Sequence, residues 1–203
     1  MRKGLALGAV ALVLGACAPS AQAPAVVPVR ATDFKSSEIR QPVVFVQVAF
    51  GAGQYDDKER RTIPEEYEGA LLEGLNTRAV LTKEVHVSAG GRDASLAAAL
   101  ARARALGADH AIFVEVRLVR GPAAFCKESR RSAFQAQATL WGQQAAVARA
   151  SDGAVRLKLT PSPTLAVYDL DADCDNPRDS RRRSPAEAAA ESVSRLLAFL
   201  FGS

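Results

Sequence analysis

The chain has 203 residues, 48% of them hydrophobic, and this length is sufficient for one domain with its own core. Its 26 basic residues nearly balance 22 acidic ones, and without residues 1–16, which contain Arg2 and Lys3, the formal charge falls from +4 to +2. Nucleic-acid binding requires concentrated cationic faces, so this balance argues against a nucleic-acid partner. No internal repeat of fixed period is present, and nothing indicates a second domain.

The first 17 residues have the three parts of an export leader. Arg2 and Lys3 precede an apolar segment, residues 5–14, that is too short to span a bilayer. The motif Leu14-Gly15-Ala16-Cys17 that follows resembles a bacterial lipobox. The resemblance implies cleavage before Cys17 by signal peptidase II, a diacylglycerol on its sulfur and an acylated amine. The alternatives are an ordinary secretory signal with an incidental cysteine and, less favoured, a transmembrane anchor.

The residues after Cys17 refine the expected location. In the lipoproteins that this motif resembles, an aspartate at the second position marks retention in the inner membrane of Gram-negative bacteria, and this chain has Ala18 and Pro19 instead. For a Gram-negative host we therefore expect an outer-membrane anchor with the protein facing the periplasm. Residues 18–28 are uncharged and rich in Ala and Pro, as in a semi-extended tether. The predicted organisation is a signal peptide over 1–16, a lipidated tether over 17–41 and one domain over 42–203.

The first half of this domain alternates strands and helices. The apolar run 42–50 predicts a buried strand, and the polar run 51–61 predicts a loop. Thr62-Ile63-Pro64-Glu65 fits a capping box with an early proline, so we expect a helix to begin there. Its apolar face should be formed by Tyr67, Leu71 and Leu75. A weaker strand is expected over 79–88 before the turn at Gly90.

A second helix and a third strand complete this half. Asp93 is placed to cap the helix, and Gly107 marks its end. The predicted apolar face of this helix contains Leu96, Leu100, Ala103 and Leu106. Residues 111–120 alternate between apolar and polar side chains, which is typical of a strand. The order strand, helix, strand, helix, strand predicts a helix-covered sheet.

The second half is predicted to be a hairpin followed by a helix. Residues 133–150 alternate as a strand does, although their Ala and Gln content also suits a helix, and Ser151-Asp152-Gly153 is a turn signal. The return strand, 154–170, is interrupted by Pro161 and Pro163. Ser184-Pro185-Ala186-Glu187 is a capping box that opens a terminal helix. We therefore predict an α/β fold with a mixed sheet of about five strands, βαβαβ followed by a β-hairpin and a C-terminal helix.

This element order carries two short phrases, residues 106–114 (LGADHAIFV) and 151–155 (SDGAV). With them, residues 42–201 resemble the amino-terminal domain of TolB, the curli-secretion lipoproteins and the lipoprotein activators of penicillin-binding proteins. Those families carry no catalytic residues in this domain, so the resemblance implies a domain without catalytic residues.

A catalytic or metal site is difficult to assemble from this sequence. The only histidines are His86 and His110, neither has metal-ligand spacing, and no serine lies in a nucleophile-elbow pattern. Gly51-Ala52-Gly53 lacks the third glycine of a dinucleotide fingerprint. Alternating aspartates at 169–175 suggest a calcium loop, but the EF-hand glycine and glutamate positions hold Cys174 and Ser180. We expect no enzyme activity, no cofactor and no metal.

Two predictions concern the loops of the second half. Cys126 and Cys174 are the only cysteines left once Cys17 is lipidated, and an even pair in an exported protein favours a disulfide over free thiols. The turn at 151–153 would place Cys174 near Arg130, at the same end of the sheet as Cys126. A possible contact for an anionic lipid headgroup or glycan phosphate consists of Arg130, Arg131, Arg181, Arg182 and Arg183. Pairing of these arginines with the nearby aspartates is the alternative.

Together these features predict a non-enzymatic envelope lipoprotein, bound to the membrane through Cys17. It would act as a scaffold or accessory subunit of a periplasmic or outer-membrane assembly, with an envelope protein as its partner. The alternative is a small-ligand or transport-accessory binding module, which a deep apolar pocket with convergent polar groups would favour. An envelope hydrolase is the least favoured function.

Overall fold

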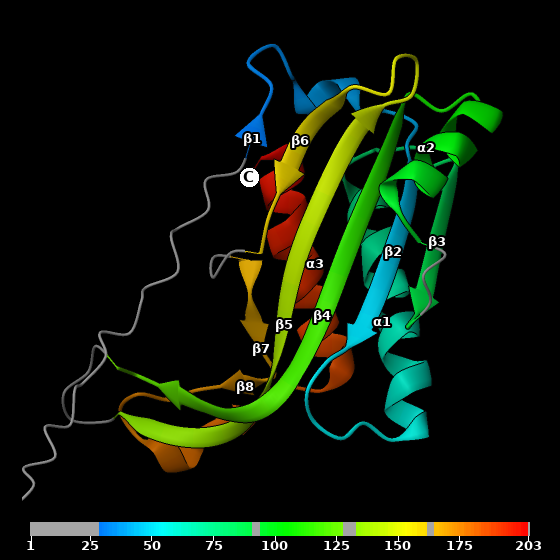
Figure 1. Cartoon of the computed structure of the whole chain (residues 1–203). Helices are drawn as coiled ribbons and strands as arrows, with labels where there is room; N and C mark the ends of the chain where they lie inside the picture. The colour runs from blue at the N-terminus through cyan, green and yellow to red at the C-terminus, as the bar shows by residue number, and fades with distance from the viewer. Residues whose placement is uncertain (1–28, 91–93, 128–132, 162–164, 203) are drawn as a thin grey trace, which may run out of the picture.

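The computed structural model describes residues 29–90, 94–127, 133–161 and 165–202. A twisted sheet has helices on both faces (Figure 1). Helices α1 (Asp57–Thr77) and α3 (Pro185–Phe201) cover one face, and the shorter α2 (Leu96–Ala105) covers the upper part of the other. The predicted α/β class, with a mixed sheet and a C-terminal helix, is confirmed.

Seven strands of the described residues form the main sheet. Their bounds are Val29–Arg30 (β1), Val43–Phe50 (β2), Glu84–Ala89 (β3), His110–Phe125 (β4), Phe134–Arg149 (β5), Val155–Leu159 (β6) and Val167–Tyr168 (β7). The order is β1-β6-β5-β4-β2-β3, and β7 also pairs with β5. Strand β2 is parallel to β3 and β4, and the other pairings are antiparallel. A second sheet pairs β8 (Leu170–Asp171) with β9 (Arg181–Arg182). The described residues also form the 3-10 helices η1 (Ser36–Glu38) and η3 (Pro177–Asp179).

Helix α1 begins earlier than predicted. Its N-cap is Asp56, whose carboxylate accepts the N–H of Glu59 while the Glu59 carboxylate accepts the N–H of Asp56. The helix therefore starts at this capping box and not at the one predicted at Thr62, and Pro64 lies inside the helix. Asp57 and Lys58 in the first turn are exposed, so no apolar period marks this turn in the sequence. The predicted apolar face of Tyr67, Leu71 and Leu75 is confirmed, because all three side chains are buried.

Helix α2 also differs at its start. Its N-cap is Ser95, whose hydroxyl accepts the N–H of Ala98, whereas the predicted cap, Asp93, lies outside the described residues. Ala99 and Ala103 are the buried residues, and the larger Leu100 is only half-buried. The helix therefore presents its alanine side to β2 and β4, because small side chains allow close approach to the sheet.

The fold includes residues that the sequence assigned to the tether. Strand β1 pairs with β6, and Phe34 and Ile39 are buried in the main core. The Ser36 hydroxyl donates to the carbonyl of Phe201 over 3.4 Å. The domain therefore includes residues from Val29 onward, ahead of the predicted start at residue 42, because this segment covers the end of the core where α1 and α3 finish.

The main core lies between the sheet and the helix pair α1 and α3. A Cβ atom at Gly74 would lie 2.4 Å from Leu197 Cδ1, so glycine permits the close approach of these two helices. Gln143 of β5 is fully buried there, and its side chain accepts from the Tyr67 hydroxyl and donates to the carbonyls of Leu165 and Ser192. One amide thus joins both helices and the β6–β7 connection to the sheet.

The C-terminal helix agrees with its prediction. Ser184 and Glu187 form the predicted capping box at its start. Its buried apolar side chains include Val193, Leu196, Leu197 and Leu200, and Phe201 is half-buried. The helix is therefore part of the core.

The hairpin register changes where the prolines occur. Ala145 pairs with Leu159, as the turn at 151–153 predicts, but Leu140 pairs with Tyr168, four residues beyond the residue that the same register would select. Pro161 lies between the two paired segments. The interruption predicted from the prolines is present, and its consequence is this shift in pairing.

Candidate functional site

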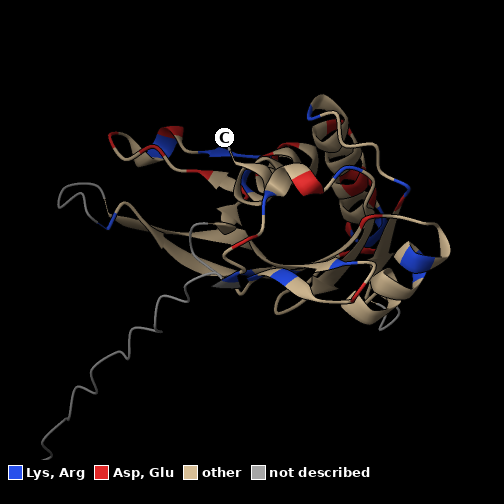
Figure 2. Cartoon of the chain, turned by 90° about the horizontal axis from the view of Figure 1, so that it is seen from above, with Lys and Arg blue, Asp and Glu red and all other residues tan. Residues whose placement is uncertain are grey.

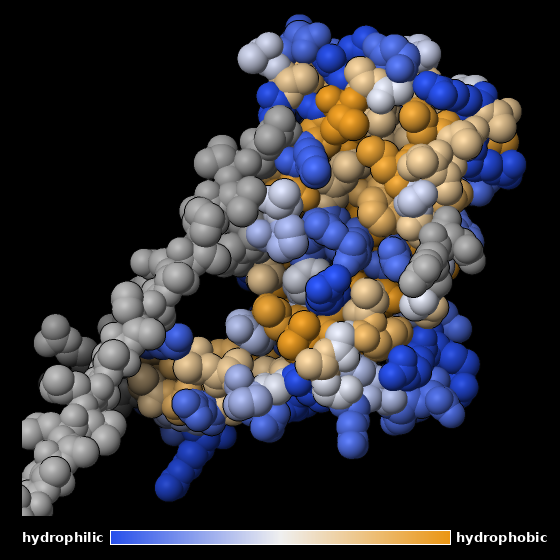
Figure 3. All heavy atoms as spheres, in the orientation of Figure 1, coloured by the Kyte–Doolittle hydropathy of each residue, from blue (hydrophilic) through white to orange (hydrophobic). Residues whose placement is uncertain are grey.

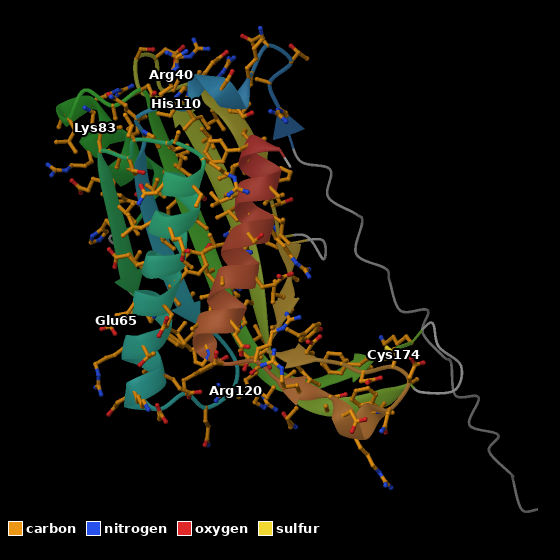
Figure 4. All side chains as sticks on the ribbon, turned by 180° about the vertical axis from the view of Figure 1, so that it is seen from behind. Arg40, Glu65, Lys83, His110, Arg120 and Cys174 are labelled. Carbon is orange, nitrogen blue, oxygen red and sulfur yellow. A yellow bond between two sulfur atoms is a disulfide. The ribbon has the colours of Figure 1, made fainter. Side chains whose placement is uncertain are left out.

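The most distinctive feature of the molecule is an arm that projects from the lower end of the sheet (Figures 1 and 4). Strands β4 and β5 are each 16 residues long, twice the length of β2, and pair along their whole length. Their outer parts, residues 121–125 and 134–138, extend beyond β2 and bend away from the helices. We define the arm as residues 121–127, 133–138 and 167–182, which include β7, β8 and β9.

The predicted disulfide joins the two parts of the arm. Cys126 follows β4 and Cys174 follows β8, and the bond between them closes a Cα–Cα distance of 5.6 Å. Both cysteines lie in loops at the same end of the sheet, so this prediction is confirmed. A disulfide is a bond of oxidising compartments such as the bacterial periplasm.

An aromatic cluster packs the open side of the arm. The ring centroids of Phe125 and Phe134 are 5.6 Å apart, and those of Phe125 and Tyr168 are 5.1 Å apart. Tyr168 continues into an apolar row across three strands, because Leu140 pairs with Tyr168 and with Val119. Val119 is 37% exposed and Tyr168 36%. This row faces away from α1 and α3, on the side where Figure 3 shows apolar surface beside hydrophilic surface.

A groove runs beside this row. Its volume is about 450 Å³, and Glu115, Arg117 and Pro161 contribute to its lining together with Val119 and Leu140. Arg117 and Glu115 pair over 3.3 Å, and Gln144 donates to the other oxygen of Glu115. One wall of the groove is therefore apolar, and on the other wall the charges of Arg117 and Glu115 are paired with each other. Such a groove suits a protein contact better than a charged ligand.

The arginines predicted as an anion contact have carboxylate partners. Arg181 pairs with Glu187 over 2.7 Å, Arg182 with Asp169 over 3.0 Å, and Arg183 with Asp171 over 3.4 Å. The mixture of basic and acidic residues along this side of the arm is visible in Figure 2. Arg130 and Arg131 lie outside the described residues, so anion binding there stays a prediction. For the other three, the structure has the internal pairing that was the alternative.

The Glu187 carboxylate at the start of α3 has a strongly lowered pKa. The N–H of Ser184, then the Arg181 guanidinium and the Ser184 hydroxyl, stabilise its charged form and lower its pKa to about 2. Asp173 accepts the N–H groups of Asp175 and Asn176, which lowers the pKa of its carboxyl. These aspartates and glutamates are therefore bound by local donors. Across the described residues there is no group of three or more His, Cys, Asp or Glu that could hold a metal ion.

Arg120 holds the base of the arm. Its guanidinium pairs with Glu59 over 2.6 Å and donates to the Thr139 hydroxyl and to the Gln54 carbonyl. It also lies 4.5 Å from the centroid of the Tyr55 ring. The bond with Arg120 lowers the pKa of Glu59, whereas burial raises the pKa of Tyr55. Arg120 thereby joins the first turn of α1 to the outer half of the hairpin.

Asp169 joins β8 and β9 to the hairpin strand β5. Its carboxylate accepts the N–H of Thr139 over 2.6 Å and pairs with Arg182. Arg182 donates in turn to the carbonyl of Gln137. The short strands β8 and β9 are thus attached to β5 by a charged network rather than by a continued ladder.

A pocket of about 380 Å³ lies between this network and the helix starts. Its apolar lining includes Ile63, Trp141 and Ala188, and its polar lining includes Glu59, Arg120, Thr139, Asp169, Arg182 and Arg183. Its size is within the range of small-molecule sites. Each of these polar groups already has a hydrogen bond or ion pair inside the protein. The pocket is therefore apolar with a self-neutralised rim.

The two histidines occupy separate structural positions. His110 begins β4 and is buried, and its Nδ1 lies 3.2 Å from Asp109 Oδ1. Asp109 Oδ2 accepts the N–H groups of Arg40 and Gln41, which ties the segment before β2 to the start of β4. His86 lies in the edge strand β3 against the ring of Phe45, at 5.0 Å between centroids. Among the described residues, neither histidine forms a hydrogen bond with a serine.

The residues at the base of the arm were not predicted from the sequence. Arg120 occupies the apolar face of β4 by alternation with Val116 and Leu118, and a charge at such a position is a signal that it has a buried partner. The Asp56 to Glu59 spacing was the second signal, since it matches a capping box. Asp169 was noted only as one of a run of aspartates.

Comparison with known proteins identifies no family. No protein-family model matches this chain, and no curated protein matches it. The chain is similar to the PelC dodecamer structure from Paraburkholderia phytofirmans at 12% identity and a TM-score of 0.42, covering 87% of this chain and 96% of that chain.

Two further solved structures are similar to this chain. The hypothetical protein CT253 from Chlamydia trachomatis has 9% identity and a TM-score of 0.33, with 80% of this chain and 99% of that chain covered. A homolog of a neuraminyllactose-binding hemagglutinin from Helicobacter pylori has 8% identity and a TM-score of 0.37, with 83% and 88% covered. Similarities of this size establish neither a family nor a function.

Proposed function

We propose that this protein is a non-enzymatic envelope lipoprotein that acts as a scaffold or accessory subunit of a periplasmic or outer-membrane assembly. It is anchored through lipid on Cys17 and presents its arm to a protein partner. The observation that carries the proposal is the disulfide-closed arm, which extends beyond the helix-covered core and combines a restrained backbone with a partly exposed apolar row. Among the described residues, no helix has the length and apolar character needed to cross a membrane, and the proposed attachment is the lipid.

A restrained arm is suited to partner binding. The disulfide, the aromatic cluster and the pairs formed by Arg120 and Arg182 restrict the arm before any partner is present. A preorganised surface loses less conformational entropy on binding than a loose loop does. Exposed aromatic and aliphatic side chains such as Tyr168 and Val119 are typical anchors of protein interfaces. The partner surface that fits this row is a largely apolar protein patch.

The proposal of a non-enzymatic role rests on how the ionisable groups are used. Catalysis by proton transfer requires a side chain free to exchange a proton with a substrate. In the described part of the chain, Glu59, Asp169 and Glu187 are each bound to an arginine, and Asp109 is bound to backbone N–H groups. These carboxylates serve the fold.

Site-specific photo-crosslinking in the envelope tests the proposed role of the arm. A photoreactive phenylalanine analogue replaces Tyr168 in the arm or, as the matched control, Leu81, which is 68% exposed at the opposite end of the molecule. We expect one discrete crosslinked envelope protein from position 168 and none from position 81. No crosslink from the arm, or the same products from both positions, would contradict the proposal. Loss of detergent-phase partitioning in Cys17→Ser separately tests the lipid anchor.

A small-ligand binding module is the second candidate, and the pocket at the base of the arm favours it. Trp141 is the only tryptophan of the chain and lines this pocket, so its emission reports occupancy. Native mass spectrometry of protein purified from its own envelope should show extra mass if a ligand is bound. Removal of that ligand should then shift Trp141 emission. Because the rim is already neutralised, we expect neither change.

A further inference from the structure

The charges of the molecule are divided between its two ends. The end opposite the arm is formed by residues 30–42, 77–84, 102–110 and 149–156, and we call it the basic end. It contains nine basic residues, namely Arg30, Lys35, Arg40, Arg78, Lys83, Arg102, Arg104, Arg149 and Arg156. Its five acidic residues are Asp33, Glu38, Glu84, Asp109 and Asp152. The basic end therefore has a formal charge of +4, although the whole chain from residue 17 has only +2.

Most acidic groups of the basic end are already bound. Asp33, Glu84 and Asp152 pair with Arg156, Arg102 and Arg149, respectively. Asp109 accepts two backbone N–H groups from the segment before β2. These contacts leave the excess of positive charge on other side chains.

Three cations of the basic end are available to an external partner. Lys35, Arg40 and Lys83 are exposed, and within the described residues their side chains form no hydrogen bond or ion pair. Arg40 and Lys83 are close in the fold, since the N–H of Leu81 donates to the carbonyl of Arg40 and the N–H of Lys83 donates to that of Pro42. Figure 4 shows both beside His110, at the end opposite Arg120 and Cys174.

The described fold also begins at the basic end. Strand β1 starts at Val29, pairs with the upper part of β6 and leads directly into residues 31–42 (Figure 1). Eleven residues separate Cys17 from Val29 (residues 18–28), and a fully extended chain of that length spans at most about 40 Å. If Cys17 is lipidated, the basic end is the part of the domain nearest to the point of attachment.

From these observations we propose that the basic end docks on an anionic lipid surface, with Lys35, Arg40 and Lys83 contacting headgroup phosphates. The inference rests on the proposed lipid anchor for its orientation. Lysine and arginine near an anionic bilayer are attracted by its surface potential, within about a Debye length. Docking of this end places the arm on the side of the domain that faces away from the membrane, where a protein partner can reach it.

Vesicle flotation tests the surface without the anchor. The protein is residues 17–203 with Cys17→Ser, which contains every described element of the fold. The vesicles are phosphatidylcholine alone or mixed with phosphatidylglycerol. The test variant is K35E/R40E/K83E, and the matched control is K58E/R61E/K127E, which reverses two exposed lysines and one exposed arginine at the arm end. Circular dichroism melting establishes that each variant is folded, and the glutamine versions replace any variant that is not.

We expect binding to phosphatidylglycerol vesicles that weakens with salt and is absent on phosphatidylcholine alone. Each cation near the surface contributes roughly fivefold, so neutralising the three cations to glutamine should weaken binding on the order of 100-fold. The charge-reversal test variant should bind more weakly still, and the control variant should stay within a few-fold of the parent. Equal losses in both variants, equal binding to both vesicle types, or no binding of the parent at low salt would overturn the proposal.

The outcome is independent of the lipid anchor. If Cys17 is not acylated, the wild-type protein will not partition into the detergent phase. If the basic end does not bind lipid, the test variant will float with the vesicles as well as the parent does. Each result can occur without the other.

Discussion

The inner and outer halves of the β4–β5 hairpin show two different ways of stabilising the same pair of strands. Inner residues such as Val114 and Val147 are buried under α1 and α3, where apolar burial and the Gln143 amide hold them. The outer residues extend past the helices, and the disulfide, a ring cluster and ion pairs hold them instead. Where a strand leaves the core, covalent and polar contacts replace the hydrophobic effect.

Removal of α3 tests the inner half most severely. A chain that ends at Ser184 exposes the side of the sheet that Val193, Leu196, Leu197 and Leu200 cover. Four such side chains at about 1.5 to 3 kcal/mol each amount to most of the stability of a typical domain. We expect no cooperative thermal transition by circular dichroism. A soluble, cooperatively melting truncation would show that the terminal helix is dispensable for the fold.

Loss of the disulfide tests the outer half. In the chain-entropy model, a bridge between residues 48 apart contributes about 4 kcal/mol. The double variant Cys126→Ser/Cys174→Ser should therefore lose up to this amount in the free energy of unfolding, measured by urea titration. Amide hydrogen exchange should accelerate most in residues 121–125 and 134–138. Equal acceleration in inner β5 would contradict the proposed division between the halves.

Gln143→Leu removes the buried amide that hydrogen-bonds α1, α3 and the β6–β7 connection to the inner half of β5. The change leaves the Tyr67 hydroxyl and two carbonyls, those of Leu165 and Ser192, without their partner in the core. A buried group left unsatisfied costs about 1 to 3 kcal/mol, so we expect a loss of about 3 kcal/mol by urea titration. Gln135→Leu, on the exposed side of the arm, is the control and should change stability by less than about 0.5 kcal/mol.

Glu59→Gln gives the smallest expected effect and depends on pH. Because Arg120 lowers the pKa of Glu59 in the folded state, the ion pair stabilises the protein at pH values above the ordinary glutamate pKa. This contribution disappears as the pH falls through the lowered pKa. The pair is partly solvent-exposed, so we expect less than about 1 kcal/mol. Urea midpoints of both proteins across acidic pH should converge at the low end, and a constant difference would refute the linkage.

Sequence patterns predicted the elements whose signals are local. Alternation identified the inner part of β4 and the whole of β5, and the Ser184 capping box identified the start of α3. The turn at 151–153 and an even pair of cysteines together predicted the disulfide. These features depend on neighbouring residues or on a short hairpin, which the sequence contains directly.

Other features depended on partners that are distant along the chain. Residues 29–41 have no strong pattern of their own, and they join the fold because the end of the core offers Phe34 and Ile39 an apolar site. The register shifts beyond Pro161, which interrupts the ladder, so that Leu140 pairs with Tyr168. The bonds of Arg120 to Glu59 and of Asp169 to Thr139 likewise join segments that only folding brings together.

By itself, the sequence determined the class of fold, the order of its elements, the disulfide pair and an expected lipid anchor, because periodicity, capping and cysteine count are local properties. Only the tertiary structure decided that the hairpin continues as an arm, that Arg181, Arg182 and Arg183 are paired internally, and that an excess of positive charge collects at the opposite end. Charges and apolar side chains are separated or joined by the path of the chain through space, and spacing along the sequence does not contain that path.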